Sequence, residues 1–359
     1  MLKRLHIFLR RIAFGANIVA VIGLLIAYAA PYVSPSRMWI VAFFGLGYPF
    51  LLLANIIFAC AWLLRRNPRA ALSLLAIVIG WSNLTGIFTF HRNSELPEHP
   101  LRVMTFNVRY FDALRNSKNE AQKYAVQDAM LKSIAEVNPD ILCGQDFSGD
   151  NAETTARALA FLKKPELLPY RYYENSSGIF SKFPIVVQGG ERFDGSYNSY
   201  HFADIKINSK TIRVYNLHLQ SNKLGYTEKI LDAETLKNIK ADETQAFYRG
   251  IFGKLYRGYC KREQQALLVK QQLDASPYPY IVCGDFNDTP ISYAYNVIAK
   301  GLKDSFRECG NGMGSTYAGP LPALRIDYIL TSPLFKIYSH RILRRDFSDH
   351  YAVVSELSL

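Results

Sequence analysis

Three long uncharged segments near the N-terminus constrain this chain more than any other feature of its sequence. They run from Ile12 to Val33 (22 residues), from Met38 to Leu64 (27 residues) and from Ala70 to Phe90 (21 residues). About 20 apolar residues in a helix cross the hydrocarbon core of a bilayer. Buried helices of a soluble protein, the alternative interpretation, would show a polar stripe at helical period, and these segments show almost none. We therefore predict three transmembrane helices, over about 12–33, 38–64 and 70–90.

The basic residues around these segments predict an orientation. Residues 1–92 contain nine Lys and Arg residues and no acidic residue, and the rest of the chain carries only +3 of the total net charge of +12. Because positively charged flanks stay in the cytoplasm, we expect an integral membrane protein with a cytoplasmic N-terminus. Its C-terminal part would be extracytoplasmic, on the periplasmic or extracellular side. A signal peptide cleaved near Ala27-Tyr28-Ala29 would leave the same placement.

Composition excludes several classes of protein. Since the excess positive charge flanks apolar runs, a uniformly basic protein that coats nucleic acid is excluded, and 49% hydrophobic residues exclude a disordered chain. Spans without an internal Asp, Glu, Lys or Arg lack the groups of an ion-coupled transporter, so we interpret them as an anchor. The cysteines predict no particular disulfide, and Cys143 and Cys283 lie in apolar runs typical of a core.

A polar, proline-containing linker over 93–100 follows the anchor of 1–92 and precedes a domain over 101–359. In that domain, short β-branched runs end in turn residues and alternate with helical stretches, notably 119–137 and 227–273. Strands interleaved with helices over about 260 residues are typical of one large α/β or α+β domain.

Five of the strand-like runs end in side chains that carry an oxygen or an imidazole. These are Asn107, Asp146, His218, the pair Asp285 and Asn287, and the pair Asp349 and His350. Strand ends that meet at one edge of a sheet are a natural place for a site. Each residue alone has a structural explanation, because Asp-Phe-Asn-Asp is a good turn and a lone His is usually in a core or on a surface.

Together, six ordered motifs resemble the endonuclease/exonuclease/phosphatase family, which includes deoxyribonuclease I, abasic-site endonucleases, neutral sphingomyelinases and inositol-polyphosphate 5-phosphatases. The motifs are FNVR (106–109), PDILCGQD (139–146), NLHL (216–219), GDFND (284–288), RIDYIL (325–330) and SDH (348–350). The resemblance implies an α/β (α+β) four-layer sandwich, with two mixed sheets packed face to face and helices outside, here preceded by three transmembrane helices. It also implies a metal-dependent hydrolase of phosphoester bonds.

The resemblance implies that Asn107, Asp146 and Asp349 hold or position a metal. Carboxylate and amide oxygens without a Cys-rich or His-rich set suit a hard cation, so Mg²⁺ or Mn²⁺ is the expected cofactor. The family's second motif usually ends in Gln-Glu, whereas here Asp146 follows Gln145 and its carboxylate is one methylene shorter. This departure supports an alternative in which the protein is a weakened or inactive membrane scaffold that retains the fold. The other motifs are intact and favour an active enzyme.

The remaining site residues are implied to act on substrate and water. Asp285 and Asn287 would orient or deprotonate the attacking water, and His350, paired with Asp327, would act as acid, base or transition-state stabiliser. The implied catalytic residues are His218, Asp285, Asn287, Asp327 and His350. The implied substrate-binding residues are Arg109, His218 and Asn287.

Two substrate classes are compatible with these motifs, because the family attacks phosphorus whatever group is attached to it. One is nucleic acid and the other is a phospholipid headgroup, which an anchored domain meets at high effective concentration. The segment from Arg249 to Arg262 holds five basic residues, no acid and interleaved aromatics. It is either the solvated face of a surface helix or a contact for anionic headgroups or a nucleic-acid backbone. Beyond the phosphoester substrate and a lipid bilayer, no obligate protein partner is evident.

Overall fold

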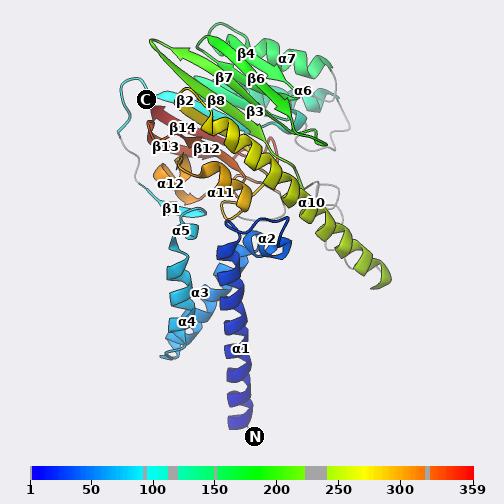
Figure 1. Ribbon diagram of the computed structural model, residues 1–359, viewed down its shortest axis with the longest axis vertical. Helices are drawn as coiled ribbons and strands as arrows, with labels where there is room; N and C mark the ends of the chain where they lie inside the picture. Colours follow the sequence, from blue (N-terminus) through cyan, green and yellow to red (C-terminus); the bar gives the residue numbers. More distant parts are fainter. Residues whose placement is uncertain (1, 92–94, 112–119, 149–151, 223–240, 320–323) are drawn as a thin grey trace.

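Two six-stranded mixed sheets pack face to face to form the body of the protein (Figure 1). The computed structural model describes residues 2–91, 95–111, 120–148, 152–222, 241–319 and 324–359. In sheet 1 the strand order is β13-β14-β2-β3-β5-β4, and β2 and β3 run parallel while the other neighbours are antiparallel. Its strands are β2 (Leu101–Asn107), β3 (Ile141–Gln145), β4 (Tyr170–Glu174), β5 (Ser177–Ser181), β13 (Lys336–Leu343) and β14 (Ala352–Ser358).

Sheet 2 has the order β10-β12-β9-β8-β7-β6, and β8 and β9 are its parallel pair. Its strands are β6 (Ile185–Arg192), β7 (Ser199–Ile207), β8 (Lys210–His218), β9 (Tyr280–Asp285), β10 (Lys303–Asp304) and β12 (Asp327–Thr331). A separate short ribbon pairs β1 (Phe88–Phe90) with β11 (Asn311–Met313). Five of the six motifs lie on or at the ends of β2, β3, β8, β9 and β12. The prediction that Asp349 and His350 end a strand is wrong, because SDH (348–350) lies in the loop before β14.

Helices cover the outer face of each sheet. On sheet 1 lie α6 (Glu120–Val137) and α7 (Ala152–Leu162), and on sheet 2 lie α10 (Ala241–Asp274) and α11 (Tyr293–Ala299). The short helices η1 (Arg109–Phe111) and α12 (Ser305–Cys309) follow β2 and β10. The predicted four-layer arrangement of two mixed sheets with outer helices is therefore confirmed. The helix predicted over 227–273 is described from Ala241, and 227–240 lie outside the described residues.

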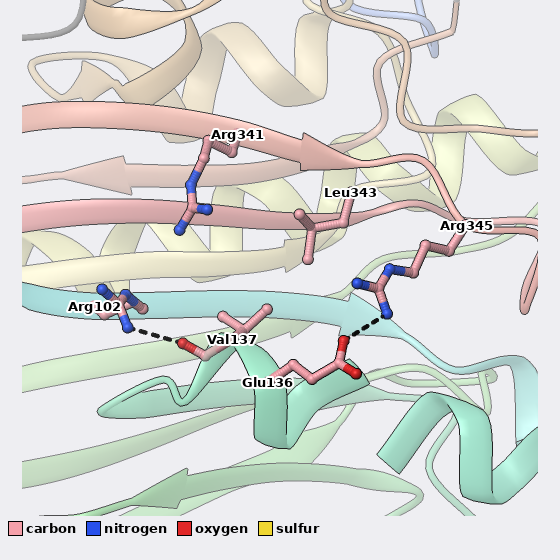
Figure 2. Close-up of a pocket in the computed structure, with 6 residues that line it drawn as sticks. All are labelled: Arg102, Glu136, Val137, Arg341, Leu343 and Arg345. Atoms are coloured by element: carbon pink, nitrogen blue, oxygen red, sulfur yellow. Dashed lines mark hydrogen bonds and ion pairs between the residues drawn. The ribbon is translucent and has the colours of Figure 1, made fainter. Parts of the chain in front are cut away.

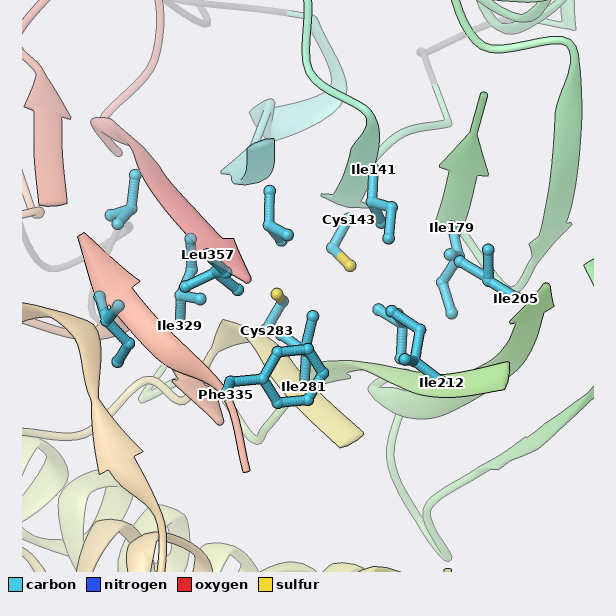
Figure 3. Packing of buried hydrophobic residues seen from close by; sticks show 14 of the residues in the cluster. Ile141, Cys143, Ile179, Ile205, Ile212, Ile281, Cys283, Ile329, Phe335 and Leu357 are labelled. Atoms are coloured by element: carbon cyan, nitrogen blue, oxygen red, sulfur yellow. The ribbon is translucent and has the colours of Figure 1, made fainter. Parts of the chain in front are cut away.

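The space between the sheets holds one continuous apolar core (Figure 3). Every second residue points into it, as the two-residue period of a strand requires, for example Ile212 and Val214 on β8 and Ile281 and Cys283 on β9. Cys143 lies across the core from Cys283, both are fully buried, and all five cysteines are free. These two cysteines are core residues, as their apolar surroundings in the sequence indicate.

The prediction of three transmembrane helices is wrong. Within the described part of the chain, α1 (Leu2–Ala29) is one helix long and apolar enough to cross a membrane. The second predicted span is two helices, α2 (Trp39–Leu46) and α3 (Tyr48–Leu64), bent by 60°. The third is α4 (Ala70–Ile79), with only 10 residues, followed by the single turn α5 (Trp81–Leu84) and by β1.

Local chemistry accounts for both breaks. Pro49 lies in the first turn of α3, where it has no N–H to donate and its ring excludes a helical carbonyl at Gly45, so α2 cannot continue into α3. Tyr28 accounts for the end of α4, because its hydroxyl donates to the carbonyl of Ala76 at 2.9 Å and its ring lies against Gly80. Such tertiary contacts cannot be identified from an uncharged run of residues.

The N-terminal helices are joined to the sandwich by buried polar contacts. Arg325, which is 1% exposed, donates to the carbonyl of Gly86 at 2.9 Å and forms a two-pronged ion pair with Asp304 at 2.7 and 2.9 Å. Asn296 donates to the carbonyl of Pro31 at 2.9 Å. Because Arg325 precedes Asp327 by two residues, the N-terminal part of the chain contacts the segment that carries part of the predicted site.

Replacing Gly284 should destabilise the sandwich. Gly284 has φ +138°, and a Cβ there would lie 1.9 Å from the carbonyl oxygen of Leu217 on the adjacent strand. We expect Gly284→Ala to lower the free energy of unfolding by about 2–5 kcal/mol, since it combines backbone strain with a backbone clash. Chemical denaturation measures this change. Gly250→Ala on α10, where a Cβ meets nothing within 4 Å, is the control and should be neutral or slightly stabilising. Equal losses in the two variants would contradict this account.

Candidate functional site

The inward-facing rows of both sheets change from apolar to polar at one edge of the sandwich. On β9, Ile281 and Cys283 belong to the core and Asp285 follows on the same face. The register places His218 beside Asp285 and Asp285 beside Asp327, so three polar side chains form a row across β8, β9 and β12. Side chains opposite one another in neighbouring strands point to the same face. The row therefore faces the inside of the sandwich.

Sheet 1 supplies the facing residues. Asn107 ends β2, and Asp349 and His350 lie in the loop that enters β14, the neighbour of β2. Ser348 fixes this loop by donating from its hydroxyl to the backbone carbonyl of Asn107 at 2.9 Å. His350 also forms a bridge with Tyr317, and the two rings meet edge to face at 5.7 Å.

The carboxylate of Asp285 lies at the centre of the site. It is 1% exposed, and it accepts hydrogen bonds from Asn107 Nδ2 at 3.0 Å and from the backbone N and Nδ2 of Asn287 at 2.8 and 3.1 Å. His218 Nε2 and His350 Nε2 lie 3.8 and 3.7 Å from Asp285 Oδ2. Burial raises the pKa of Asp285 to about 6, against the opposing effect of the neighbouring imidazoles.

His350 is held by the carboxylate of Asp327. Its Nδ1 lies 3.1 Å from both oxygens of Asp327, which fixes the ring with Nε2 toward Asp285. Burial alone would lower the pKa of His350, but Asp327 and Asp285 stabilise the protonated ring and raise the pKa to about 10. At neutral pH the imidazole is therefore a buried cation with one N–H available to the site.

Two further pairs complete the group. Asp146 Oδ1 lies 3.6 Å from His218 Nδ1, and Arg109 Nη1 lies 3.1 Å from Asp349 Oδ2. Asp349 Oδ1 is also 4.0 Å from His350 Nε2. The structure thus brings all nine sequence-predicted site residues into one network of contacts no longer than 4.0 Å.

Left-handed backbone residues place several of these side chains. Asp146 and Asn287, which directly follow or lie close after β3 and β9, have φ of +48° and +51°. Three successive residues after β2, Arg109 to Phe111, have φ between +44° and +59°. Such conformations cost about 1–3 kcal/mol each for residues other than glycine and concentrate at functional sites. The turns that present Arg109, Asp146 and Asn287 are therefore strained.

The donor set fits a hard divalent cation. Asp285, Asp327 and His350 offer ligand atoms that all lie within 4.8 Å of one another, so this triplet is a possible metal site. Four carboxylates converge here, those of Asp146, Asp285, Asp327 and Asp349, against the cations Arg109 and His350. The excess of negative charge and the oxygen-rich ligands match Mg²⁺ or Mn²⁺.

Two buried amides support the site from behind, and the sequence analysis missed both. Gln145 donates to Asn216 Oδ1 at 2.7 Å, and Asn216 Nδ2 donates to the carbonyls of Gly144 and Gly178 at 2.9 Å. Asn216 is on sheet 2 and its partners are on sheet 1, so these bonds join the sheets. The sequence does carry a signal for Asn216, because this residue precedes His218 by two positions and therefore lies on the same face of the strand.

A separate hollow of about 330 Å³ lies on the outer face of sheet 1 (Figure 2). It is lined by Arg102, Glu136, Val137, Arg341, Leu343 and Arg345. Arg102 pairs with the buried Glu356 at 2.9 Å and Arg345 pairs with Glu136 at 3.0 Å. Its residues are distinct from those of the inter-sheet site, and each of its three arginines lies within 4.0 Å of an acidic partner, Glu356 or Glu136, so we assign no chemistry to it.

Comparison with known proteins places this geometry in context. Residues 104–350 match the model of the endonuclease/exonuclease/phosphatase family, and residues 10–87 match a domain of unknown function. No curated protein matches the chain at a significant level. The endonuclease/exonuclease/phosphatase from Bacteroides vulgatus shares 18% identity and a TM-score of 0.51 over 73% of this chain and 100% of its own. D. rerio TDP2 complexed with single-strand DNA product shares 15% identity and a TM-score of 0.50 over 73% and 100%.

Removing the Asp327 carboxylate should lower the pKa of His350. With Asp327→Asn the imidazolium loses its hydrogen-bonded counter-ion, so the pKa should fall by about 1–3 units from its value near 10. NMR titration of the His350 ring in metal-free protein measures the change. Asp274→Asn, an exposed carboxylate at the end of α10, is the control and should leave this titration unchanged. A His350 pKa that is the same in both variants would contradict the pairing.

Proposed function

The chain belongs to the endonuclease/exonuclease/phosphatase family, and we propose that it is a divalent-metal-dependent phosphoesterase in which water attacks phosphorus. The observation that carries this proposal is the buried Asp285 carboxylate, which contacts Asn107, Asn287, His218 and His350 at the edge where the two sheets meet. A carboxylate with a raised pKa beside an imidazolium supplies both a proton acceptor and a proton donor at one point.

Asp285 is the residue that we assign to the attacking water. Its Oδ1 and Oδ2 are fixed by Asn287 and Asn107, so the carboxylate is positioned to orient the water and take its proton. His350 Nε2, on the same side, donates a hydrogen bond to the phosphoryl oxygens as negative charge develops. Arg109, His218 and Asn287 would bind the remaining phosphate oxygens.

We assign Asn107, Asp146 and Asp349 to the metal. When bound, Mg²⁺ or Mn²⁺ would polarise a non-bridging phosphate oxygen and stabilise the leaving oxygen. This assignment leaves the Asp327 and His350 pair intact, because Asp327 engages His350 Nδ1 at 3.1 Å. Asp146, in its left-handed turn, has its carboxylate within 3.6 Å of His218, so the shorter side chain still reaches the site.

The substrate carries a phosphoester on a nucleic acid or on a phospholipid headgroup. The small net charge of the C-terminal part is less than a duplex-binding surface needs. D. rerio TDP2, which shares the fold, was solved with a DNA product. An inactive scaffold is the competing function, and the network around Asp285 argues against it because buried carboxylates and histidines are costly to keep without use.

We also propose that the N-terminal helices lie in a membrane, as an anchor with one continuous spanning helix. The packing of α1, α3 and α4 buries polar side chains beside an apolar cluster and leaves many apolar side chains exposed. Asn17, Asn55 and Ser73 are 0% exposed at the helix contacts, and Asn17 bonds to Ser73 at 2.6 Å and to Trp62 at 3.0 Å. The outer surface carries apolar residues instead, including Val19, Ile22, Phe50, Leu53, Ile57, Leu75, Val78 and Ile79. Small and amide residues inside with apolar residues outside are typical of helices that pack in lipid.

The basic residues of this anchor support the predicted orientation. Arg69 lies over the ring of Phe14 at 4.3 Å, so the turn between α3 and α4 is beside the N-terminal half of α1 and its basic residues. The sandwich lies at the opposite end of the helices (Figure 1). Since basic ends stay in the cytoplasm, the catalytic part would be extracytoplasmic, with its boundary in the linker at 93–100.

Loss of His350 or Asp285 should abolish hydrolysis. We expect His350→Ala and Asp285→Ala each to lower the rate by about 10²–10⁴-fold, the range for a lost acid or base. The assay uses the full-length protein with Mg²⁺ and a panel of plasmid DNA, RNA, sphingomyelin-like lipid and inositol phosphates. His99→Ala, at a side chain that is 91% exposed, is the matched control. Activity that survives both substitutions would show that Asp285 and His350 are not the catalytic residues.

Metal binding should depend on Asp146. We expect Asp146→Ala to weaken Mn²⁺ binding by about 10–100-fold, as when a metal site loses a supporting carboxylate. Asp146→Glu should bind at least as tightly as the natural protein, because it restores the longer reach. Calorimetric titration with Mn²⁺ measures both without relying on turnover, and exposed Asp128→Asn is the control. Unchanged binding in Asp146→Ala would exclude this carboxylate from the metal site.

A further inference from the structure

A band of exposed aromatic, apolar and basic residues lies on one side of the junction between the N-terminal helices and the sandwich. It comes from the turn before α2, from α2 itself and from the middle of α10 (Figure 1). We call it the girdle, and its members are Tyr32, Arg37, Met38, Trp39, Ile40, Phe252, Tyr256 and Arg257. Tyr32 is 75% exposed and Ile40 is 52% exposed, so the apolar side chains of the girdle are not covered by the rest of the chain.

The two halves of the girdle are held together by ring contacts. Trp39 meets Tyr256 with ring centroids 6.1 Å apart, and Phe43 meets Phe252 at 5.2 Å and Tyr259 at 5.6 Å. These contacts use one side of each ring. Trp39 is still 43% exposed and Phe252 48% exposed, so the other sides face outward together.

Hydrogen bonds fix the girdle to the sandwich. Glu263, on α10 and 9% exposed, accepts from the hydroxyls of Ser34 and Ser36 at 2.6 and 3.1 Å and from the backbone N of Ser36 at 2.9 Å. A buried carboxylate with three donors is costly to expose. The turn before α2 and helix α10 therefore move as one body, and the girdle keeps a fixed position relative to the catalytic residues.

The girdle is continuous with the apolar surface of the anchor and lies at its end near the sandwich. Between Gly47 and the basic turn at Arg65, the 17 residues of α3 are about 25 Å long at 1.5 Å per residue, a little less than the roughly 30 Å of a bilayer core. Arginines mark one limit of this span, and Trp39, Tyr32 and Tyr256 mark the other. Trp and Tyr concentrate at the level of the headgroups.

The charged residues of the girdle are both basic. Arg37 and Arg257 are exposed, and the girdle contains no acidic residue. Two basic residues of the segment 249–262 already have partners within the protein. Arg262 is 0% exposed and pairs with Asp288 at 2.8 Å, and Lys261 donates to the carbonyl of Gly195. The side chain of Arg249 is not among those that the structure describes. A nucleic-acid backbone would need a longer row of accessible cations than these.

We infer that the girdle rests in the headgroup layer of an anionic bilayer and sets the height of the active site above it. This inference rests on the proposed membrane placement of the anchor. Its consequence follows from Ile291, six residues after Asp285, which is 1% exposed and packs in the core of the anchor with Leu24 and Tyr48. The segment that directly follows the catalytic carboxylate at the end of β9 therefore packs against the anchor, which brings the site within reach of phosphoesters borne on lipids.

Lipid-depth quenching tests the inference on the full-length protein in nanodiscs of phosphatidylcholine with phosphatidylglycerol. Lipids carry bromine, which quenches tryptophan fluorescence, either near the headgroup or near the methyl end of the acyl chains. The fluorescence of the natural protein minus that of Trp39→Phe reports the quenching of Trp39 alone. We expect the shallow bromines to quench Trp39 about twofold more than the deep ones. Ile57→Trp, at an exposed position in the middle of α3, is the companion reporter and should show the opposite preference.

The charge of the girdle is tested in the same nanodiscs. Arg37→Glu with Arg257→Glu should reduce the shallow quenching of Trp39 to the value found in phosphatidylcholine alone, whereas Arg192→Glu, on the exposed strand β6, should not. If Trp39 is not quenched but the tryptophan of Ile57→Trp is, the girdle does not lie in the headgroup layer, although the helices are in the membrane. If neither is quenched, the membrane placement fails and the girdle fails with it. Quenching that is independent of anionic lipid would overturn the charge recognition.

Discussion

The site depends on the point at which the core between the two sheets stops being apolar. Along β9 the inward row reads Ile281, Cys283 and then Asp285, and along β2 it reads Val103, Thr105 and then Asn107. The same packing that excludes water from the core therefore surrounds the Asp285 carboxylate with low-dielectric material. That environment raises the pKa of Asp285 and strengthens its interaction with the His350 imidazolium. Fold and chemistry share one physical cause, which is burial at a strand end.

Much of this arrangement is predictable from the sequence, because the rule that produces it is local. Strand ends that meet at one edge predict a polar cluster there, and the family resemblance adds Arg109 and Asp327. All nine predicted residues lie in one network. The strand period places Asn216 on the same face as His218, but its contact with Gln145 joins the two sheets and is not predictable from either strand alone. Arg262 was interpreted as part of a surface stripe, yet it is fully buried, since its partner Asp288 is 26 residues later and comes into contact only through folding.

The N-terminal helices show where a composition argument fails. An uncharged run indicates that a segment is apolar enough to enter lipid, but it does not give the length of the helix that forms. Two of the three runs are divided, one at Pro49 and one at Gly80. Which polar residues of this bundle are buried, such as Asn17 and Ser73, is instead a property of the packed structure. Arg325, two residues before Asp327, then links the two parts, because it bonds to Gly86 after the N-terminal helices and to Asp304 in the sandwich. The N-terminal helices are therefore structural neighbours of the candidate site.

Crystallographic location of Mn²⁺ tests the central claim most directly. Crystals of the full-length protein grown with Mn²⁺ would be measured at the manganese absorption edge, where anomalous scattering identifies the ion. The account predicts a peak bounded by Asn107, Asp146 and Asp349, with the contact between His350 and Asp327 still formed. A peak enclosed by Asp285, Asp327 and His350 would contradict the assigned roles. The absence of any peak at this edge of the sandwich would contradict the claim that the polar end of the inter-sheet core is a metal-dependent phosphoesterase site.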